Sequence, residues 1–413
     1  MKKLFTIFSI IAFAFTFTAC VKDDSAIYSS SYGLRTIASY HDATLYVTTT
    51  PLGDGHIKVI RLSGSFQEMG RQYGYLLKTD LQNYYQNIIV DYLMGVKGMS
   101  YNELVAGAEE SYANALADTR KFMQGIVKTS GLTLTQIQLI NNSMLEVIAA
   151  CSAVVGWGQH TGYGPLVIGR NWDMNTGSLD KLKDYMMVVV YNPPTGNSVA
   201  DINYMGQFQY FQTAINDKRL WIDMQNGSLS STLTDNTKQD PNSAIFQFLR
   251  SASTMDQLDT LFMAGAASAS FIMTAADPNV AYSYFWCTQG TYRFSENNQS
   301  GLLATANHFV EYPETWTINT LSSDPATQMY TELRRNNWLA LANSPVFYGN
   351  LTDETMKTML GYTIENGGGS FPASGYAAET IYQIVAVPRD LRLWIRLPKY
   401  FGWEKIELLP LFD

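Results

Sequence analysis

The chain of 413 residues has few charges, few cysteines and few histidines, and each shortage argues against a class of function. Charged residues make up 15%, with a net charge of −8 and no basic run, so the clustered Lys and Arg that nucleic-acid phosphates require are missing. Three Cys and four scattered His form no Cys-x-x-Cys or His-Glu-x-x-His spacing, and we expect neither a metal nor a cofactor. The 46% of hydrophobic residues predicts a large buried core.

The first twenty residues have the layout of a secretory signal, with Lys2 and Lys3 before an apolar or hydroxyl stretch. That stretch is short for a membrane span. A cysteine directly after Ala19 resembles the end of a bacterial lipoprotein signal. The resemblance implies a lipid on Cys20, attachment to a membrane, and a place in the envelope of a Gram-negative bacterium, at the outer membrane or the cell surface. An ordinary signal peptide with an incidental Cys is the alternative.

The rest of the chain divides into three segments that differ in composition and in predicted secondary structure. Residues 21–55 are rich in Ser, Thr and Tyr and predict a tether, while residues 56–150 predict a short strand at 56–62 and then helices. Residues 151–413 alternate short strand-like runs with helices and form one globular unit with 56–150, which predicts an α+β protein. The expected helices are 66–94, 101–127, 134–150, 243–250, 255–264, 326–342 and 353–360. The expected strands from 152 onward are 152–157, 166–172, 185–191, 198–204, 211–215, 220–224, 270–275, 281–286, 302–306, 380–387 and 391–397.

Cys151 lies where the helical stretch 134–150 runs into a strand-like stretch. The small Ala149 and Ala150 leave room for the thiol to attack the carbonyl before it, and a cut between Ala150 and Cys151 would make Cys151 a new N-terminus. Its α-amine, with a pKa near 7.7–8.0, could then act as the base for a thiol whose ordinary pKa is near 8.5.

Two other interpretations of Cys151 stay open. A papain-like pair needs a histidine, and the nearest, His160, lies in a turn-like stretch with nothing that marks it as a base. Cys151 could also form a disulfide with Cys287, although Cys287 sits in an aromatic strand-like run typical of a small buried side chain.

The sequence Ala150-Cys151-Ser152, followed by Gly169-Arg170-Asn171-Trp172-Asp173, resembles the N-terminal-nucleophile (Ntn) hydrolases of the isopenicillin N acyltransferase and choloylglycine hydrolase superfamily. Further resemblances lie at 60–74, 213–217, 304–309 and 380–398. Together they cover most of residues 57–398. The resemblance implies a four-layer αββα sandwich with a helical N-terminal segment.

Carried over residue by residue, the resemblance makes Cys151 the nucleophile through its sulfur and the base through its amine. Arg170 would interact with the thiolate and lower its pKa. Asp173 would accept a hydrogen bond from the α-ammonium, and Asn216 and Asn307 would donate N–H groups to the oxyanion. Residues three apart on a strand point to opposite faces, so Arg170 and Asp173 should reach one site only if the strand bulges or ends between them.

The resemblance also implies an arginine on the helix after Asn307. This helix carries Arg334 and Arg335 at a shifted spacing, and the resemblance assigns neither. The implied activity is hydrolysis of linear amide C–N bonds in N-acyl compounds by a self-processed enzyme, through an acyl-thioester. Candidate substrates are N-acyl amino acids, bile-salt-like conjugates and penicillin-type side chains. An acyltransferase that uses the same thioester, an inactive surface binding protein and a phospholipase-B-like protein are the alternatives.

Overall fold

The structure is a computed structural model that describes residues 32–143, 149–175, 182–208, 212–296, 301–372 and 374–413. The expected signal 1–20 and its Cys20 lie outside the described residues, so the lipid anchor stays a prediction. Within the described ranges, no helix combines the length and the apolar character that crossing a bilayer demands.

Two sheets form the centre of the molecule. Sheet A has ten strands in the order β1 (Gly33–Tyr40), β2 (Ala43–Thr50), β3 (Gly53–Ser63), β6 (Met186–Asn192), β7 (Val199–Tyr204), β8 (Thr213–Asn216), β9 (Trp221–Asn226), β10 (Phe271–Ala276), β11 (Ala281–Cys287) and β12 (Gly290–Phe294). Sheet B has six, in the order β13 (Leu302–Thr305), β4 (Ala149–Gly156), β5 (Val167–Asn175), β14 (Ala378–Val387), β15 (Arg392–Leu397) and β16 (Phe401–Glu407). The β3–β6 pair is parallel, and the other pairs are antiparallel.

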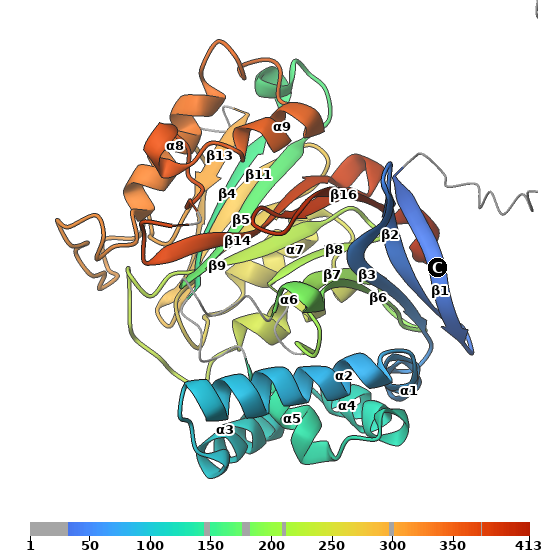
Figure 1. Cartoon of the computed structure of the whole chain (residues 1–413). Helices are drawn as coiled ribbons and strands as arrows, with labels where there is room; N and C mark the ends of the chain where they lie inside the picture. The colour runs from blue at the N-terminus through green and yellow to red at the C-terminus, as the bar shows by residue number, and fades with distance from the viewer. Residues whose placement is uncertain (1–31, 144–148, 176–181, 209–211, 297–300, 373) are drawn as a thin grey trace, which may run out of the picture.

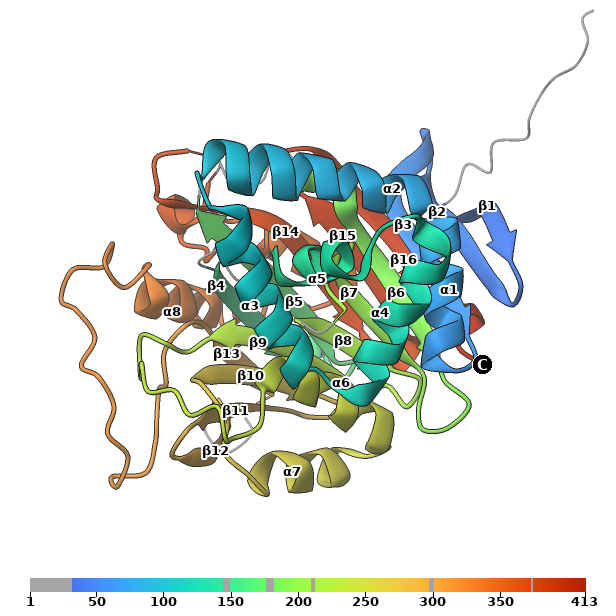
Figure 2. The same cartoon turned by 90° about the horizontal axis from the view of Figure 1, so that it is seen from below.

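Helices cover the outer faces of both sheets (Figure 1). Over sheet B lie α8 (Thr331–Ala342) and α9 (Asp353–Met359). On the side of sheet A lie α1 (Phe66–Leu76), α2 (Lys78–Tyr84) with its π-helical continuation Tyr85–Val96, α3 (Tyr101–Asn114), α4 (Ala117–Ser130), α5 (Leu134–Asn142), α6 (Pro241–Ser251) and α7 (Met255–Met263). Figure 2 looks onto the α1–α5 group. The four layers confirm the predicted α+β, αββα fold class.

The N-terminal helices pack closely because glycines line their contact. A Cβ on Gly70 of α1 would lie 2.0 Å from the carbonyl oxygen of Phe122, and one on Gly125 of α4 would lie 2.2 Å from that of Gln67. Both glycines therefore permit an approach of the two backbones that no larger residue allows.

The predicted tether 21–55 is wrong for its described part, which forms β1, β2 and the start of β3. Thr and Tyr favour strands as much as linkers, and β2 buries Ala43, Leu45 and Val47 on alternate positions. The buried Glu404 of β16 accepts the N–H groups of His56 and Ile57 and so fixes this region to sheet B. The helical segment is thus preceded by three strands.

Several element boundaries also differ from the prediction. The helix expected at 66–94 is α1, α2 and the π-helical turn, and the one expected at 101–127 is broken at Ala115 and Leu116 between α3 and α4. The helix expected at 134–150 ends at Asn142, and β4 already begins at Ala149. Cys151 is therefore the third residue of its strand, and strands β12 and β16 were not expected.

Candidate active site

Cys151 lies in the interior of sheet B, between β5 and β13. It pairs with Trp172 of β5, its side chain faces sheet A, and only 1% of its surface is exposed. Its thiol is free, as is that of Cys287 at the end of β11 in the other sheet, so the disulfide alternative is wrong.

The thiol faces one fixed positive charge. Nη2 of Arg170 lies 3.8 Å from Sγ of Cys151. Burial raises the pKa of the Cys151 thiol to about 12, although Arg170 opposes that rise. The guanidinium of Arg170 is itself held by Thr213, by Tyr382 Oη at 3.0 Å, by the carbonyl of Met224 at 2.8 Å and by Asp223 at 3.6 Å. In the continuous chain the thiol is protonated at neutral pH and needs a base before it can attack.

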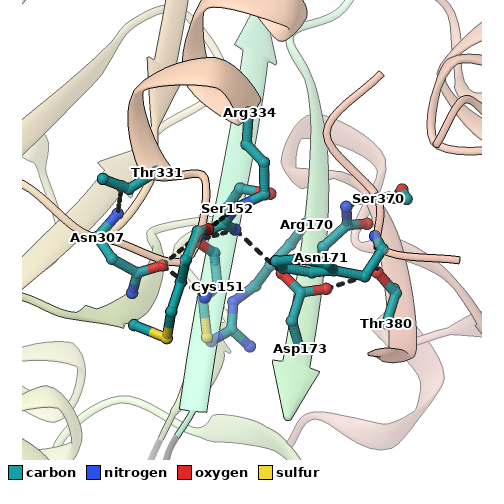
Figure 3. Close-up of polar contacts among 12 residues, drawn as sticks. Cys151, Ser152, Arg170, Asn171, Asp173, Asn307, Thr331, Arg334, Ser370 and Thr380 are labelled. Atoms are coloured by element: carbon teal, nitrogen blue, oxygen red, sulfur yellow. Dashed lines mark hydrogen bonds and ion pairs between the residues drawn. The ribbon is translucent and has the colours of Figure 1, made fainter. Parts of the chain in front are cut away.

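The main chain of Cys151 is bound by Asn307, which follows β13, and by Arg334 of α8 (Figure 3). Its N–H donates to Oδ1 of Asn307 at 3.0 Å, and its carbonyl accepts from Nη1 of Arg334 at 3.0 Å. Arg334 also donates to Oδ1 of Asn307 at 2.6 Å and pairs with Asp173 at 3.1 Å. Arg334, left unassigned by the resemblance, thus connects Asp173 and Asn307 to the nucleophile residue.

Asp173 is fully buried beside Arg334 and accepts a hydrogen bond of 2.6 Å from the hydroxyl of Thr380. Burial raises its pKa to about 6, against the opposing effects of the Arg334 charge and the Thr380 hydrogen bond. Above pH 6 the carboxylate and Arg334 therefore form an ion pair.

Strand β5 neither bulges nor ends between Arg170 and Asp173, and the irregularity lies on its neighbour β14. The β4–β5 register runs without interruption, so Arg170 and Asp173 point to opposite faces, and the register of β14 against β5 slips between Thr380 and Tyr382. Residues two apart on a strand normally share a face, and the slip sends Thr380 to Asp173 and Tyr382 to Arg170. Arg170 therefore contacts the thiol of Cys151, whereas Asp173 is connected to the main chain of Cys151 through Arg334.

The structure contradicts the oxyanion role predicted for Asn216. Its amide donates to the carbonyls of Leu249 and Ala252, at 2.8 and 2.9 Å, and its Oδ1 accepts from the main chain. It ties β8 to the end of α6. Asn307 does reach Cys151, but its Nδ2 donates to the carbonyl of Asn226 at 2.9 Å.

Sequence reasoning missed Arg334, Thr331 and Asn226. Thr331, the first residue of α8, accepts the N–H of Asn307 at 2.7 Å and contacts Nδ1 of His308 at 2.9 Å. Asn226 ends the buried strand β9, a position where a polar residue is a usable signal. His160 offers no papain-like base, because its ring binds Asn343 and packs on Tyr348.

The raised pKa of Asp173 predicts a dependence of stability on pH. Because its pKa in the unfolded chain is about 3.9, the folded state binds the proton more tightly, and this contribution to stability is lost as pH rises from about 4 to about 6. The free energy of unfolding of the wild type, minus that of Asp173→Asn, should fall over this window in urea titrations. Asp324→Asn is the control, because hydrogen bonds from Thr327 and Ala326 lower the pKa of that exposed carboxyl below the window. A constant or rising difference for Asp173→Asn would contradict the prediction.

No family model and no curated protein matches this chain. Among solved structures it is similar to the N-acylethanolamine-hydrolyzing acid amidase ortholog of Caenorhabditis elegans, at 12% identity and a TM-score of 0.39 over 58% of this chain and 93% of that one. It is also similar to a variant of conjugated bile acid hydrolase from Clostridium perfringens, at 10% identity and a TM-score of 0.44 over 62% of this chain and 92% of that one. A third is penicillin V acylase from Agrobacterium tumefaciens, at 9% identity and a TM-score of 0.35 over 62% and 86%.

Proposed function

We propose that this protein is a cysteine N-terminal-nucleophile hydrolase, which cuts its own chain before Cys151 and then hydrolyses linear amide C–N bonds of N-acyl compounds. One observation carries the proposal. Cys151 is held through both of its reactive groups, its thiol by Arg170 of the neighbouring strand β5 and its main-chain nitrogen by Asn307, which follows the other neighbouring strand, β13. A cysteine that only fills the core needs neither contact.

In the first reaction the Cys151 sulfur attacks the carbonyl carbon of Ala150. The thiol proton passes to the Cys151 nitrogen, so that the C–N bond breaks as a thioester forms. Water then hydrolyses the thioester, which releases the Ala150 carboxylate and restores the thiol beside a free α-amine on Cys151. The nitrogen that becomes this amine is the atom that now lies 3.0 Å from Oδ1 of Asn307. Arg334 donates to the same oxygen, which holds that acceptor in place.

In the second reaction the α-amine takes the thiol proton, and Arg170 stabilises the thiolate. The sulfur attacks the substrate amide, the α-ammonium returns its proton to the leaving amine, and water hydrolyses the acyl-thioester to a carboxylic acid. Arg334 and Asp173 keep the main chain of Cys151 fixed while its sulfur and nitrogen react. Acyl transfer would differ only in the final acceptor, an amine in place of water.

Substitutions of two asparagines test whether Asn307 takes part in catalysis or only stabilises the fold. Asn307→Ala removes the acceptor that holds the Cys151 nitrogen, and we expect kcat to fall by about 10²–10³, the scale of losing one preorganised hydrogen-bonding group. Asn216→Ala is the matched control, because it leaves the carbonyls of Leu249 and Ala252 unpaired and should cost about 1–3 kcal/mol of stability while kcat is kept. Amide hydrolysis and thermal melting of both variants test the assignment. Equal kcat in the two variants would remove Asn307 from the site.

A further inference from the structure

A cavity of about 680 Å³ lies next to the candidate active site, on the Asn307 side. Segment 309–330, which projects beside α8 in Figures 1 and 2, forms one wall, and α8 forms another. The walls include Ser230, His308, Gln328, Glu332 and Arg335.

Three chain segments connect this cavity to Cys151. His308 lines the cavity and directly follows Asn307, which binds the Cys151 nitrogen. Arg335 lines it and directly follows Arg334, which binds the Cys151 carbonyl. Neighbouring Cα atoms are only about 3.8 Å apart, so the wall of the cavity lies one residue from the groups that hold the nucleophile.

The third segment follows β9, whose last residue, Asn226, accepts from Asn307. Ser230 in this segment lines the cavity, and its hydroxyl accepts the N–H of Phe309 at 2.7 Å. The carbonyl of Ser230 accepts the N–H of Asn319 at 2.7 Å, which attaches the covering segment at a second point. The covering segment is therefore held by hydrogen bonds at two points, and this wall of the cavity is a built part of the fold.

One wall of the cavity carries a buried acceptor that has no partner in the part of the chain that the structure describes. Oε1 of Gln328, a residue only 6% exposed, has no hydrogen-bond partner among the described residues, while its Nε2 donates to the carbonyl of Ser322 at 2.7 Å. Glu332, four residues on, has no ion-pair partner in the described ranges. A buried amide oxygen without a partner calls for a ligand that donates a hydrogen bond, and the exposed carboxylate of Glu332 lies on the same wall.

The basic side chains of the wall are not available to a carboxylate on a ligand. Arg335 is occupied by Glu296 and by the carbonyl of Ala304. Burial, together with the nearby Arg335 and Arg334, lowers the pKa of His308 to about 4, so His308 is neutral at pH 7. A carboxylate on a ligand would therefore meet Glu332 while both of these basic side chains are occupied or uncharged.

We propose that this cavity binds the leaving-amine half of the amide substrate and selects amines that carry a hydroxyl or an ammonium group over amines that carry a carboxylate. This inference rests on the proposed function and narrows its substrate class. The polar walls suit the amine half, because an apolar acyl chain would leave the buried Oε1 of Gln328 without a partner. Gln328 acts as the specificity residue.

The test compares four octanoyl amides, of ethanolamine, 1,3-diaminopropane, n-propylamine and glycine. For the wild type we expect kcat/KM of the first two to exceed that of the propylamide by about tenfold, the effect of one hydrogen bond to a buried acceptor. Gln328→Leu should erase this preference by raising KM and leave the propylamide unchanged. Gln328→Glu should keep the fold through a similar shape and strengthen the preference for the ammonium. Leu333→Gln, exposed on α8 and outside the cavity, is the control and should match the wild type.

A wild-type preference for the glycine amide, or an equal loss on all four amides in Gln328→Leu, would overturn the inference. Calorimetric titration with free 1,3-diaminopropane separates the two proposals, since binding does not require catalysis. Binding that Gln328→Leu abolishes supports the cavity even if no amide is hydrolysed, in which case the proposed function fails alone. Hydrolysis without any preference and without diamine binding contradicts the cavity alone.

Discussion

Replacing Cys151 with Ala should leave the protein as one chain and lower amide hydrolysis by a factor on the order of 10⁶, the loss seen when a covalent nucleophile is removed. The wild type should give two chains on denaturing mass spectrometry, the second beginning at Cys151 and ending at Asp413. Both effects have one cause, because the same sulfur attacks the Ala150 carbonyl and the substrate. Since Cys151 is small and almost fully buried, Ala preserves most of its packing, and the variant should remain folded.

The cleaved protein should nevertheless elute as one particle under native conditions. Strand β3 precedes the cut and β6 follows it, and these two strands pair in parallel from Lys58 with Met187 to Ser63 with Asn192. Because β1 and β2 extend from β3, the first fragment supplies one end of the ten-stranded sheet. Cys287→Ala is the matched control, since this second free thiol lies in the other sheet and should be dispensable for both reactions. A wild-type protein that stays uncut and is fully active would contradict the proposed N-terminal-nucleophile mechanism.

The sequence predicted the position of a site residue only where that position follows from neighbouring parts of the chain. The motifs around Cys151, Arg170 and Asp173 identified side chains whose positions follow from two adjacent, antiparallel strands. The register slip of β14 between Thr380 and Tyr382 has no compositional signature, because it is set by pairing across 207 residues of chain. The sequence showed that Arg170 and Asp173 should point to opposite faces of a regular strand, but it did not show how both contribute to one site.

The sequence also could not predict the contacts of Asn216, Asn226 and Arg334, which depend on residues far along the chain. Asn216 and Asn226 both lie at the ends of short buried strands, and the sequence motif favoured Asn216, although it is Asn226 that contacts Asn307. Arg334 was unassigned because the length of the segment before α8 shifts its position along the chain, whereas burial and its contacts with Asp173 and Asn307 place it in the site. The prediction of a tether at residues 21–55 failed for another reason. Ser, Thr and Tyr are common in linkers, but Thr and Tyr also favour strands.

Replacing Arg334 with Leu should destabilise the fold by about 3–5 kcal/mol, because it leaves the buried carboxylate of Asp173 without its charge partner. It also removes the donors to the Cys151 carbonyl and to Oδ1 of Asn307, so activity should be lost as well. Urea unfolding and amide hydrolysis measure the two effects separately. Arg334 opposes the rise that burial causes in the pKa of Asp173, so this pKa should rise further in the variant. The penalty should therefore shrink as pH falls toward 6 and the carboxyl of the variant takes up its proton.

The double variant Arg334→Leu with Asp173→Asn separates electrostatics from positioning. Neutralising Asp173 should recover a large part of the lost stability, since no uncompensated charge remains in the core, while hydrolysis stays abolished because nothing holds the Cys151 carbonyl. Arg293→Leu on the edge strand β12 is the control, because its ion pair with Asp259 is partly exposed. If the double variant regained activity together with stability, Arg334 would be a purely structural residue. If Arg334→Leu kept its full stability at pH 7, the ion pair would not balance the burial of Asp173, and that carboxyl would have to be protonated in the native state.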